Sequence, residues 1–142
     1  MAEQTGLPTK LLLEIVTPEG LLLRESVDQV IAPGSEGYFG VLPGHTPFLS
    51  TLGAGLITVF SGGAREYLTC FWGFCEVLPD RVNILAELGE RAEAIDLARA
   101  ESAKARAEAA MKAVTDEAGY TEAHAAYIKA VTRLAVAHKN RA

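Results

Sequence analysis

Short runs of residues with the pattern of strands recur between residues 10 and 86 of the chain. The run VDQVIA at 27–32, for example, alternates as a strand in a partly exposed sheet does. Turn residues rich in glycine and proline separate the runs. Many short strands with no helix between them are typical of an antiparallel sandwich or flattened barrel. The predicted strands are 10–17, 21–24, 27–32, 48–52, 55–60, 65–71, 73–78 and 81–86.

From Ile95 the period of the pattern changes to that of helices. The segment IDLARAESAKARAEAAMKAV is rich in strong helix formers, with acids near its start and bases further on. Gly119 is expected to end this helix, and a second helix is predicted from about 121 to 138. Its predicted apolar stripe has spacings of four and three residues: Tyr120, His124, Tyr127, Val131, Leu134 and His138. Alanine dominates the first helix, so the two should pack closely as an αα-hairpin.

The segment PGSEGYFGVLPGHTP at 33–47 interrupts the strand pattern. Four glycines and three prolines in fifteen positions predict a shaped surface loop rather than a helix or an ordinary strand. Its large side chains, Tyr38, Phe39, Val41 and Leu42, lie between glycines and are presented on a stiff turn. This arrangement favours a docking edge, although a plain turn between two strands is the simpler alternative.

Composition divides the chain into two parts. All six prolines and twelve of the thirteen glycines lie before residue 90, whereas the remainder is rich in alanine and charged residues. We therefore expect an α+β chain, with a β domain over 1–89 and a helical hairpin over 90–142. The net charge of −5 is also uneven, because residues 1–89 carry ten acids and four bases, and residues 90–142 carry eight acids and nine bases.

The chain ends in a basic segment without acids after Glu122. Its four cations are Lys129, Arg133, Lys139 and Arg141. They suit an acidic partner, or they simply complement the dipole at the end of a helix. Four charges are too few to predict nucleic-acid binding, which needs a broad basic face.

Several other classes of function receive little support. Cys70 and Cys75 lie in an apolar context that predicts buried thiols in a reducing compartment, without a metal site. No nucleophile elbow or P-loop is present, and the acids are scattered, so we predict no catalytic residues. The start MAEQTGLPTK lacks a signal-peptide pattern, and glycines and prolines break the uncharged window at 37–64, which cannot be a membrane-spanning helix.

Five sequence motifs together carry a family resemblance over almost the whole chain. They are PEG at 18–20, VDQVIAPGSEGYFGVLPGHTP at 27–47, LGAGLITV at 52–59, GFCEV at 73–77 and IDLARA at 95–100. In this combination the chain resembles the epsilon subunit of the bacterial F-type ATP synthase. The resemblance implies an amino-terminal antiparallel β-sandwich of about ten strands, followed by a carboxy-terminal antiparallel hairpin of two helices.

The resemblance also implies a non-catalytic subunit in the rotating central stalk of a proton-translocating complex. The partners would be the gamma subunit and the c-ring of the membrane sector, on the cytoplasmic side of the bacterial inner membrane, to which the chain would be peripheral. The implied c-ring contacts are Glu36, Tyr38 and His45. Related sequences often carry an acid at the position of Tyr38, so we expect a packing contact there rather than an ionic one.

In this family the hairpin lies folded on the sandwich or extends into the catalytic head and blocks ATP hydrolysis. The resemblance therefore implies contacts between the alpha and beta catalytic subunits and the extended arm. The candidate residues for this inhibition are the four cations of the basic segment, Lys129, Arg133, Lys139 and Arg141.

Some family members bind ATP through an I/L-D-x-x-R-A motif, which suggests ATP as a regulatory ligand, although no cofactor is required. The implied contacts are Glu90, Ile95, Asp96, Arg99, Ala100, Arg106 and either Lys129 or Arg133. Arginines would neutralise phosphate charge, and Asp96 would accept hydrogen bonds from the nucleotide. Alternatively, Asp96 caps the helix and Arg99 pairs with it at i,i+3.

Two other functions stay open, a free-standing ATP sensor and a general adaptor domain, and a pull-down with gamma separates them from a stalk subunit.

Overall fold

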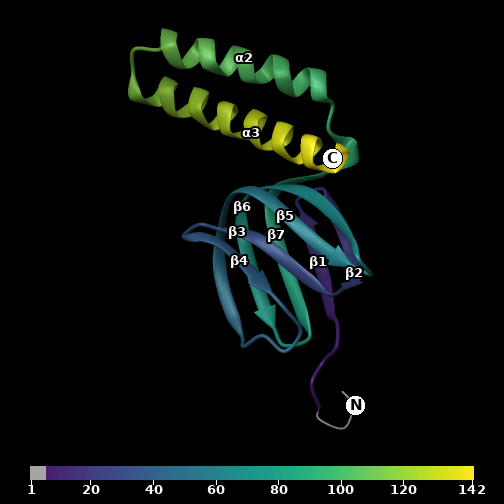
Figure 1. The fold of residues 1–142 in the computed structure, drawn as a ribbon. Helices are drawn as coiled ribbons and strands as arrows, with labels where there is room; N and C mark the ends of the chain where they lie inside the picture. Colours follow the sequence, from purple (N-terminus) through teal and green to yellow (C-terminus); the bar gives the residue numbers. More distant parts are fainter. Residues whose placement is uncertain (1–5) are drawn as a thin grey trace.

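A computed structural model describes residues 6–142 of the chain, which form a β-sandwich with a two-helix hairpin at one end (Figure 1). The strands are β1 Leu11–Thr17, β2 Gly20–Val27, β3 Gln29–Gly34, β4 Gly37–Val41, β5 Phe48–Ser61, β6 Ala64–Leu78 and β7 Arg81–Arg91. The short 3-10 helix η1 Ala92–Ala94 leads to helices α2 Leu97–Ala113 and α3 Glu117–Arg141. The expected α+β order, sandwich first and hairpin second, is confirmed.

The strands form one sheet in the order β2-β1-β7-β6-β5-β3-β4. All neighbours are antiparallel except β1 and β7, which run parallel, so the expectation of a purely antiparallel sandwich is wrong at this pair. The Asp28 amide, between β2 and β3, donates to the Phe60 carbonyl at 2.8 Å and continues the pairing of β3 with β5. The predicted division at residue 89 falls near the end of β7, and residues 1–5 lie outside the described part.

The hydrophobic core lies entirely within the sandwich. In β1, Leu11, Leu13 and Ile15 are fully buried, while Leu12 between them is 38% exposed. This period of two is what a strand with one buried face requires. The core cluster extends from Leu11 to Ala86 and contains no residue of the hairpin.

Residues 6–142 contain seven strands, whereas the resemblance implied about ten and the sequence pattern predicted eight. Strand β5 joins the predicted strands 48–52 and 55–60, β6 joins 65–71 and 73–78, and β4 is an additional strand. Strand β5 passes through Gly55, where a Cβ atom would lie 2.4 Å from the Tyr38 hydroxyl. Strand β6 passes through Gly73, where a Cβ atom would lie 1.9 Å from the Leu85 carbonyl oxygen. These glycines allow neighbouring groups to approach the strands closely, and they do not form turns.

The predicted loop at 33–47 contains a strand. Residues Gly37–Val41 form β4, which pairs with β3 across a tight turn, with Gly34 opposite Gly37. The positive φ of Gly37, 134°, explains why this turn needs glycine. The remaining loop, residues 42–47, leads to β5.

The helix boundaries also differ from the prediction. Helix α2 ends at Ala113, and Gly119 lies in the first turn of α3 rather than at the end of α2. The Asp116 side chain caps α3 by accepting the Gly119 amide hydrogen bond at 3.2 Å. A cap residue and the following glycine therefore start a helix here, whereas the glycine alone suggested an end.

The predicted stripe on the second helix is largely wrong. Tyr120, His124 and His138 are exposed, and only Leu134 of the six stripe residues is buried. The buried residues of α3 are mostly small: Ala123, Ala130, Thr132, Leu134, Val136 and Ala137. In α2 just Ala100 and Ala107 are buried. Alanines line the contact because close helix packing leaves little room for longer side chains.

Among residues 6–142, no helix is long and apolar enough to cross a membrane.

Candidate functional site

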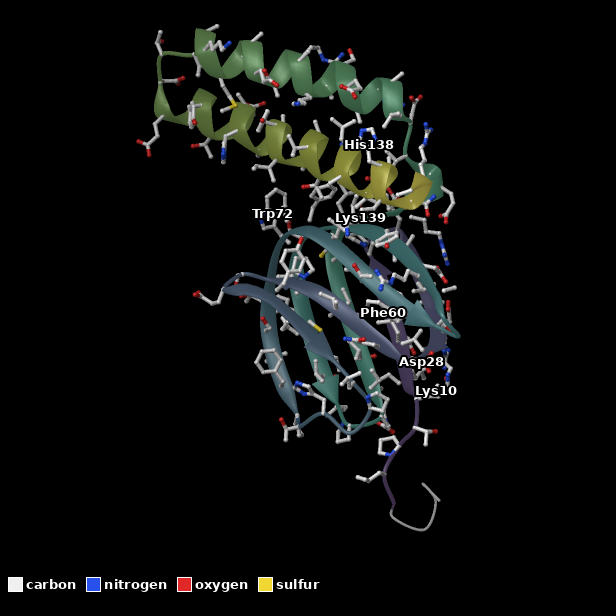
Figure 2. All side chains as sticks on the ribbon, viewed as in Figure 1. Lys10, Asp28, Phe60, Trp72, His138 and Lys139 are labelled. Carbon is white, nitrogen blue, oxygen red and sulfur yellow. The ribbon has the colours of Figure 1, made fainter. Side chains whose placement is uncertain are left out.

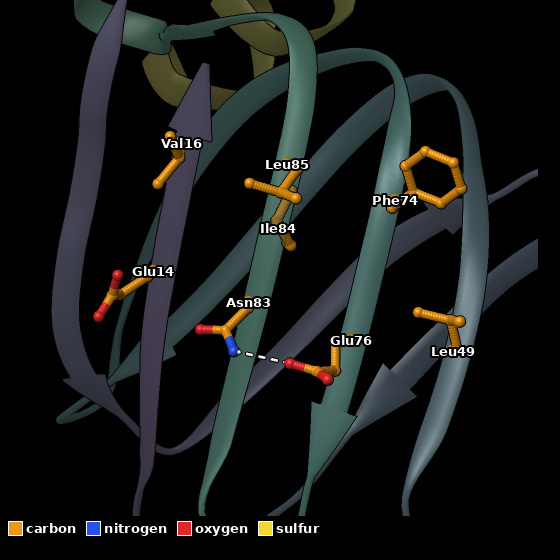
Figure 3. A pocket seen from close by; sticks show the side chains of 8 residues that line it. All are labelled: Glu14, Val16, Leu49, Phe74, Glu76, Asn83, Ile84 and Leu85. Atoms are coloured by element: carbon orange, nitrogen blue, oxygen red, sulfur yellow. Dashed lines mark hydrogen bonds between the residues drawn. The ribbon is translucent and has the colours of Figure 1, made fainter. Parts of the chain in front are cut away.

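A shallow groove of about 460 Å³ lies on the outer face of the sheet, across β1, β7, β6 and β5 (Figure 3). Its apolar part is formed by Val16, Leu49, Phe74 and Leu85, of which Leu49 is 72%, Phe74 54% and Leu85 56% exposed. These positions alternate with core residues such as Cys75 and Ile84. Large apolar side chains on the solvent face of a strand indicate a docking surface.

Polar side chains lie beside this apolar groove. Glu14 and Glu76 line it with Asn83, whose amide donates to Glu76 Oε1 at 3.1 Å. Glu14 also pairs with Arg24 at 3.6 Å. An adjoining apolar hollow, lined by Pro18, Gly73 and Phe74 among others, extends the surface toward Glu87. The surface therefore suits a partner that presents apolar side chains and a cation.

The implied c-ring residues lie along the edge strand β4. Glu36 is exposed in the turn before β4, and His45 follows it in the loop 42–47. Tyr38 is 58% exposed, yet its hydroxyl accepts the Leu56 amide hydrogen bond at 3.0 Å. His45 Nδ1 lies 2.6 Å from the Thr46 carbonyl. Because β4 separates Glu36 from His45, one partner could contact all three residues only along the length of this edge.

The structure brings together seven of the eight candidate residues for ATP binding. A cleft of about 330 Å³ beside the end of β7 and α2 is lined by Glu90, Ala94, Ile95, Asp96, Arg99, Ala100, Ala103, Arg106 and Arg133. Lys129 does not line it, because its ammonium lies 5.8 Å from the centre of the Trp72 ring. Three guanidinium groups and two carboxylates give this cleft an excess of positive charge.

Four of the five charged groups in the cleft already have partners, among them Arg106, whose guanidinium donates to the Ser102 hydroxyl at 3.3 Å. Arg133 Nε lies 2.8 Å from Glu90 Oε1, which also accepts from the Thr69 hydroxyl at 3.3 Å. Asp96 Oδ1 accepts the Arg99 amide hydrogen bond at 3.1 Å and caps α2. The cap predicted for Asp96 is confirmed, but within residues 6–142 the guanidinium of Arg99 forms no ion pair with it.

Sequence reasoning missed the aromatic partners of the basic segment. Lys129, Arg133 and Lys139 lie over the rings of Trp72, Phe71 and Tyr67, at 5.8, 5.4 and 5.7 Å from the ring centres. The run YLTCFW in β6 was the signal that could have suggested them, since three aromatics lie within six positions. Their pairing with a helix about sixty residues later is visible only in three dimensions.

The two cysteines have the character of buried structural thiols. Both are fully inaccessible, and burial raises the pKa of each thiol from 9.0 to about 12. A thiol with this pKa is a poor nucleophile at neutral pH. In the described range 6–142, no group of three or more His, Cys, Asp and Glu side chains could hold a metal ion.

Fold and surfaces together define a class of protein: a small β-sandwich that carries a helical hairpin and offers docking surfaces. Known families show the same division. A model of the ATP synthase delta/epsilon chain β-sandwich domain matches residues 10–92, and a model of the delta/epsilon chain long α-helix domain matches residues 93–138.

Curated relatives agree over nearly the whole length. The chain is 48% identical over 130 residues to the ATP synthase epsilon chain of Syntrophobacter fumaroxidans, covering 92% of this chain and 97% of the relative. It is 44% identical over 135 residues to the epsilon chain of Solibacter usitatus, covering 94% and 99%. The chain therefore belongs to the ATP synthase delta/epsilon chain family, and the epsilon chain is a non-catalytic subunit of that complex.

Solved structures show the same fold. A chain from the Euglena gracilis mitochondrial ATP synthase, in a structure of its OSCP, F1 and c-ring, is 26% identical with a TM-score of 0.77, covering 85% of this chain and 77% of that one. A chain from the central stalk and c-ring of the Tetrahymena thermophila mitochondrial ATP synthase has a TM-score of 0.59 at 14% identity and shows likeness of fold alone.

Proposed function

We propose that this chain is a rotor subunit of the central stalk, fastened between gamma and the c-ring, whose hairpin restrains ATP hydrolysis. Family membership supports the stalk assignment, and the exposed groove on the outer sheet face carries it structurally. The chain would be peripheral, on the cytoplasmic side of a bacterial inner membrane. Each of the three contacts has its own test.

The groove formed by Val16, Leu49, Phe74 and Leu85 is the proposed gamma site. Burying these side chains would contribute roughly 25 cal/mol per Å² of apolar surface. Phe74→Asp should abolish capture of gamma in a pull-down, because a charge would be buried against apolar groups. Tyr120→Asp, at an exposed aromatic on the hairpin, is the matched control and should leave capture unchanged. Equal capture by both variants would reject this site.

The β4 edge with its following loop is the proposed c-ring contact, through Glu36, Tyr38 and His45. Leu42, 56% exposed in the same loop, offers a variant that spares those residues and the fold. Leu42→Asp should weaken retention of the chain and gamma on membranes that contain the c-ring, while capture of isolated gamma stays normal. Normal retention on the membranes would argue against this edge.

The hairpin is the proposed unidirectional brake. When extended, it would place Lys129, Arg133, Lys139 and Arg141 against acidic segments of the alpha and beta subunits. An appendage that adds nothing to the sandwich core can change partners at low cost, which supports this role. Deleting the chain from Ala92 onward should raise ATP hydrolysis by the assembled complex. Unchanged hydrolysis would reject the brake.

The cleft beside α2 is the proposed site for ATP as a regulatory ligand. Arg99, Arg106 and Arg133 would contact phosphate, since guanidinium groups match phosphate oxygens in pairs. Calorimetry on the isolated chain should show heat that is lost in Arg99→Ala. For Asp96, Asn is the better replacement, because Asp96→Asn keeps the helix cap and removes only the charge. An absence of heat at millimolar ATP would remove the proposal.

A free-standing ATP sensor or an adaptor domain is the alternative function. Either would bind its ligand or partner without gamma. The pull-down that tests the groove also decides this question, because a sensor or adaptor would not capture gamma.

A further inference from the structure

Three aromatic side chains of one strand face three cations of one helix. Tyr67, Phe71 and Trp72 belong to β6, and Lys139, Arg133 and Lys129 belong to α3. Each cation lies within 5.8 Å of the centre of a different ring, the range in which a cation is attracted to an aromatic face. Figure 2 shows Trp72 and Lys139 between α3 and the strands. The whole arrangement joins the hairpin to the sandwich.

Trp72 has a backbone conformation that calls for an explanation. Its φ is +59°, and it is the one non-glycine residue in the described range 6–142 with a positive φ. Such a conformation is strained for a bulky residue and persists only where other contacts hold it. Here the indole contacts Lys129 and lies 6.2 Å from the Phe71 ring, so the two rings form adjoining parts of one surface.

Phe71 lies outside the sandwich core but is fully buried. The guanidinium of Arg133 covers its ring at 5.4 Å, while Arg133 Nε bonds to Glu90 at 2.8 Å. One side chain of α3 is thus held by two groups of the sandwich. Val136, three residues beyond Arg133 and three before Lys139, is also fully buried and lies on the same face of the helix.

We propose that Tyr67, Phe71 and Trp72 form a latch that holds the hairpin against the sandwich through the cations of α3. The hairpin can then contact either the sandwich or an acidic partner, but not both at once. The inference rests on the proposed function, because Lys129, Arg133 and Lys139 are three of the four cations assigned to the catalytic head. While the rings and Glu90 hold them, these charges cannot contact an acidic segment elsewhere. The free energy of these contacts therefore sets the fraction of chains in which the hairpin is released from the sandwich.

Val136→Cys provides a probe of release in the full-length chain. A thiol at this buried position reacts with a thiol reagent only when the arm leaves the sandwich, so the reaction rate follows the open fraction. Cys70 and Cys75 serve as an internal reference, because they are buried in the sandwich core and react only when the sandwich opens.

Trp72→Gly, combined with Val136→Cys, distinguishes release of the hairpin from unfolding of the sandwich. Glycine relieves the backbone strain and removes the ring, so the reference cysteines should react no faster. The introduced thiol at position 136 should react about threefold faster, the equivalent of one exposed cation–π contact.

Lys129→Met keeps the aliphatic stem without the charge and should have the same effect. The Trp72→Gly/Lys129→Met double variant should react at position 136 no faster than either single variant, because both substitutions remove the same contact. Trp72→Phe, which keeps a ring, should react more slowly than Trp72→Gly.

Two results would overturn the latch. One is an unchanged reaction rate at position 136 in both Trp72→Gly and Lys129→Met. The other is a double variant whose effect equals the sum of the two, which would mean that the residues act separately. The assay uses the chain without its complex, so its outcome is independent of the hydrolysis assay that tests the brake.

Discussion

Among single residues, Gly73 occupies the most demanding position in the sheet. Its φ is +144°, and an added Cβ atom would lie 1.9 Å from the Leu85 carbonyl oxygen. Gly73→Ala should therefore lower the free energy of unfolding by at least about 3 kcal/mol, measured by urea denaturation. Gly62→Ala is the control, because Gly62 has a φ of +58° with open space around it and should lose only about 1 kcal/mol. Equal losses would show that close approach at Gly73 is unimportant.

The two buried cysteines should make the free energy of unfolding fall at alkaline pH. Burial raises the pKa of Cys70 and Cys75 from 9.0 in the unfolded chain to about 12 in the fold. The unfolded chain therefore loses these protons first, so stability is full below pH 9 and falls as pH rises toward 12. The loss should approach about 1.4 kcal/mol per pH unit for each thiol. Denaturation of Cys70→Ala between pH 8 and 11 should show a shallower slope, and an identical slope would contradict this assignment.

Residue roles were predictable where the partner is close in the chain. Asp96 could be assigned as a helix cap because its partner, the Arg99 amide, lies three residues away. The sequence left open whether Lys129 or Arg133 lies in the ATP cleft. Arg133 lines it, whereas Lys129 lies over Trp72, which is far away in sequence and belongs to a different domain. Charge alone identified the cation but could not identify the ring.

At the scale of the sheet, the Tyr38 side chain supplies a hydrogen bond where β3 does not pair with β5. The pairing of β3 with β5 shifts register between Ile31 and Gly34, so the middle of β5 has no hydrogen-bonding partner on that side. The Tyr38 hydroxyl accepts the Leu56 amide hydrogen bond there. Tyr38→Phe should destabilise the fold by about 1 kcal/mol and accelerate hydrogen exchange at Leu56. The amide of Thr58, beyond the irregular stretch, is the control and should exchange as before. If Leu56 exchange is unaffected, the proposed tie between β4 and β5 is wrong.

Most element types followed from the sequence, but β4 lies in a segment predicted as a loop, and the strand boundaries predicted inside β5 and β6 are wrong. Alternation identified both strands correctly, whereas Gly55 and Gly73 suggested breaks that are absent. A glycine that allows close approach and a glycine that forms a turn have the same sequence signal. The outer groove was also missed, because a period of two does not say which apolar residues of a strand remain exposed.

In the molecule as a whole, the core and the hairpin are separate. Since the core cluster runs from Leu11 to Ala86, a chain that ends at Arg91 should fold and melt within a few degrees of the full chain. It should also bind more of a hydrophobic dye, because loss of α3 uncovers Phe71. Phe71→Ser in the shortened chain should remove the extra dye binding. An unfolded shortened chain would show that the hairpin belongs to the core.

The outer sheet face is the surface that we expect to fasten the chain to gamma within the assembled complex. It can be probed by photo-crosslinking from a photoreactive residue at position 74 in membranes that hold the whole complex, with the same residue at position 120 as the control. We expect a gamma adduct from position 74 and none from position 120. Absence of the adduct at 74, or the same gamma adduct from both positions, would show that gamma does not dock on this face.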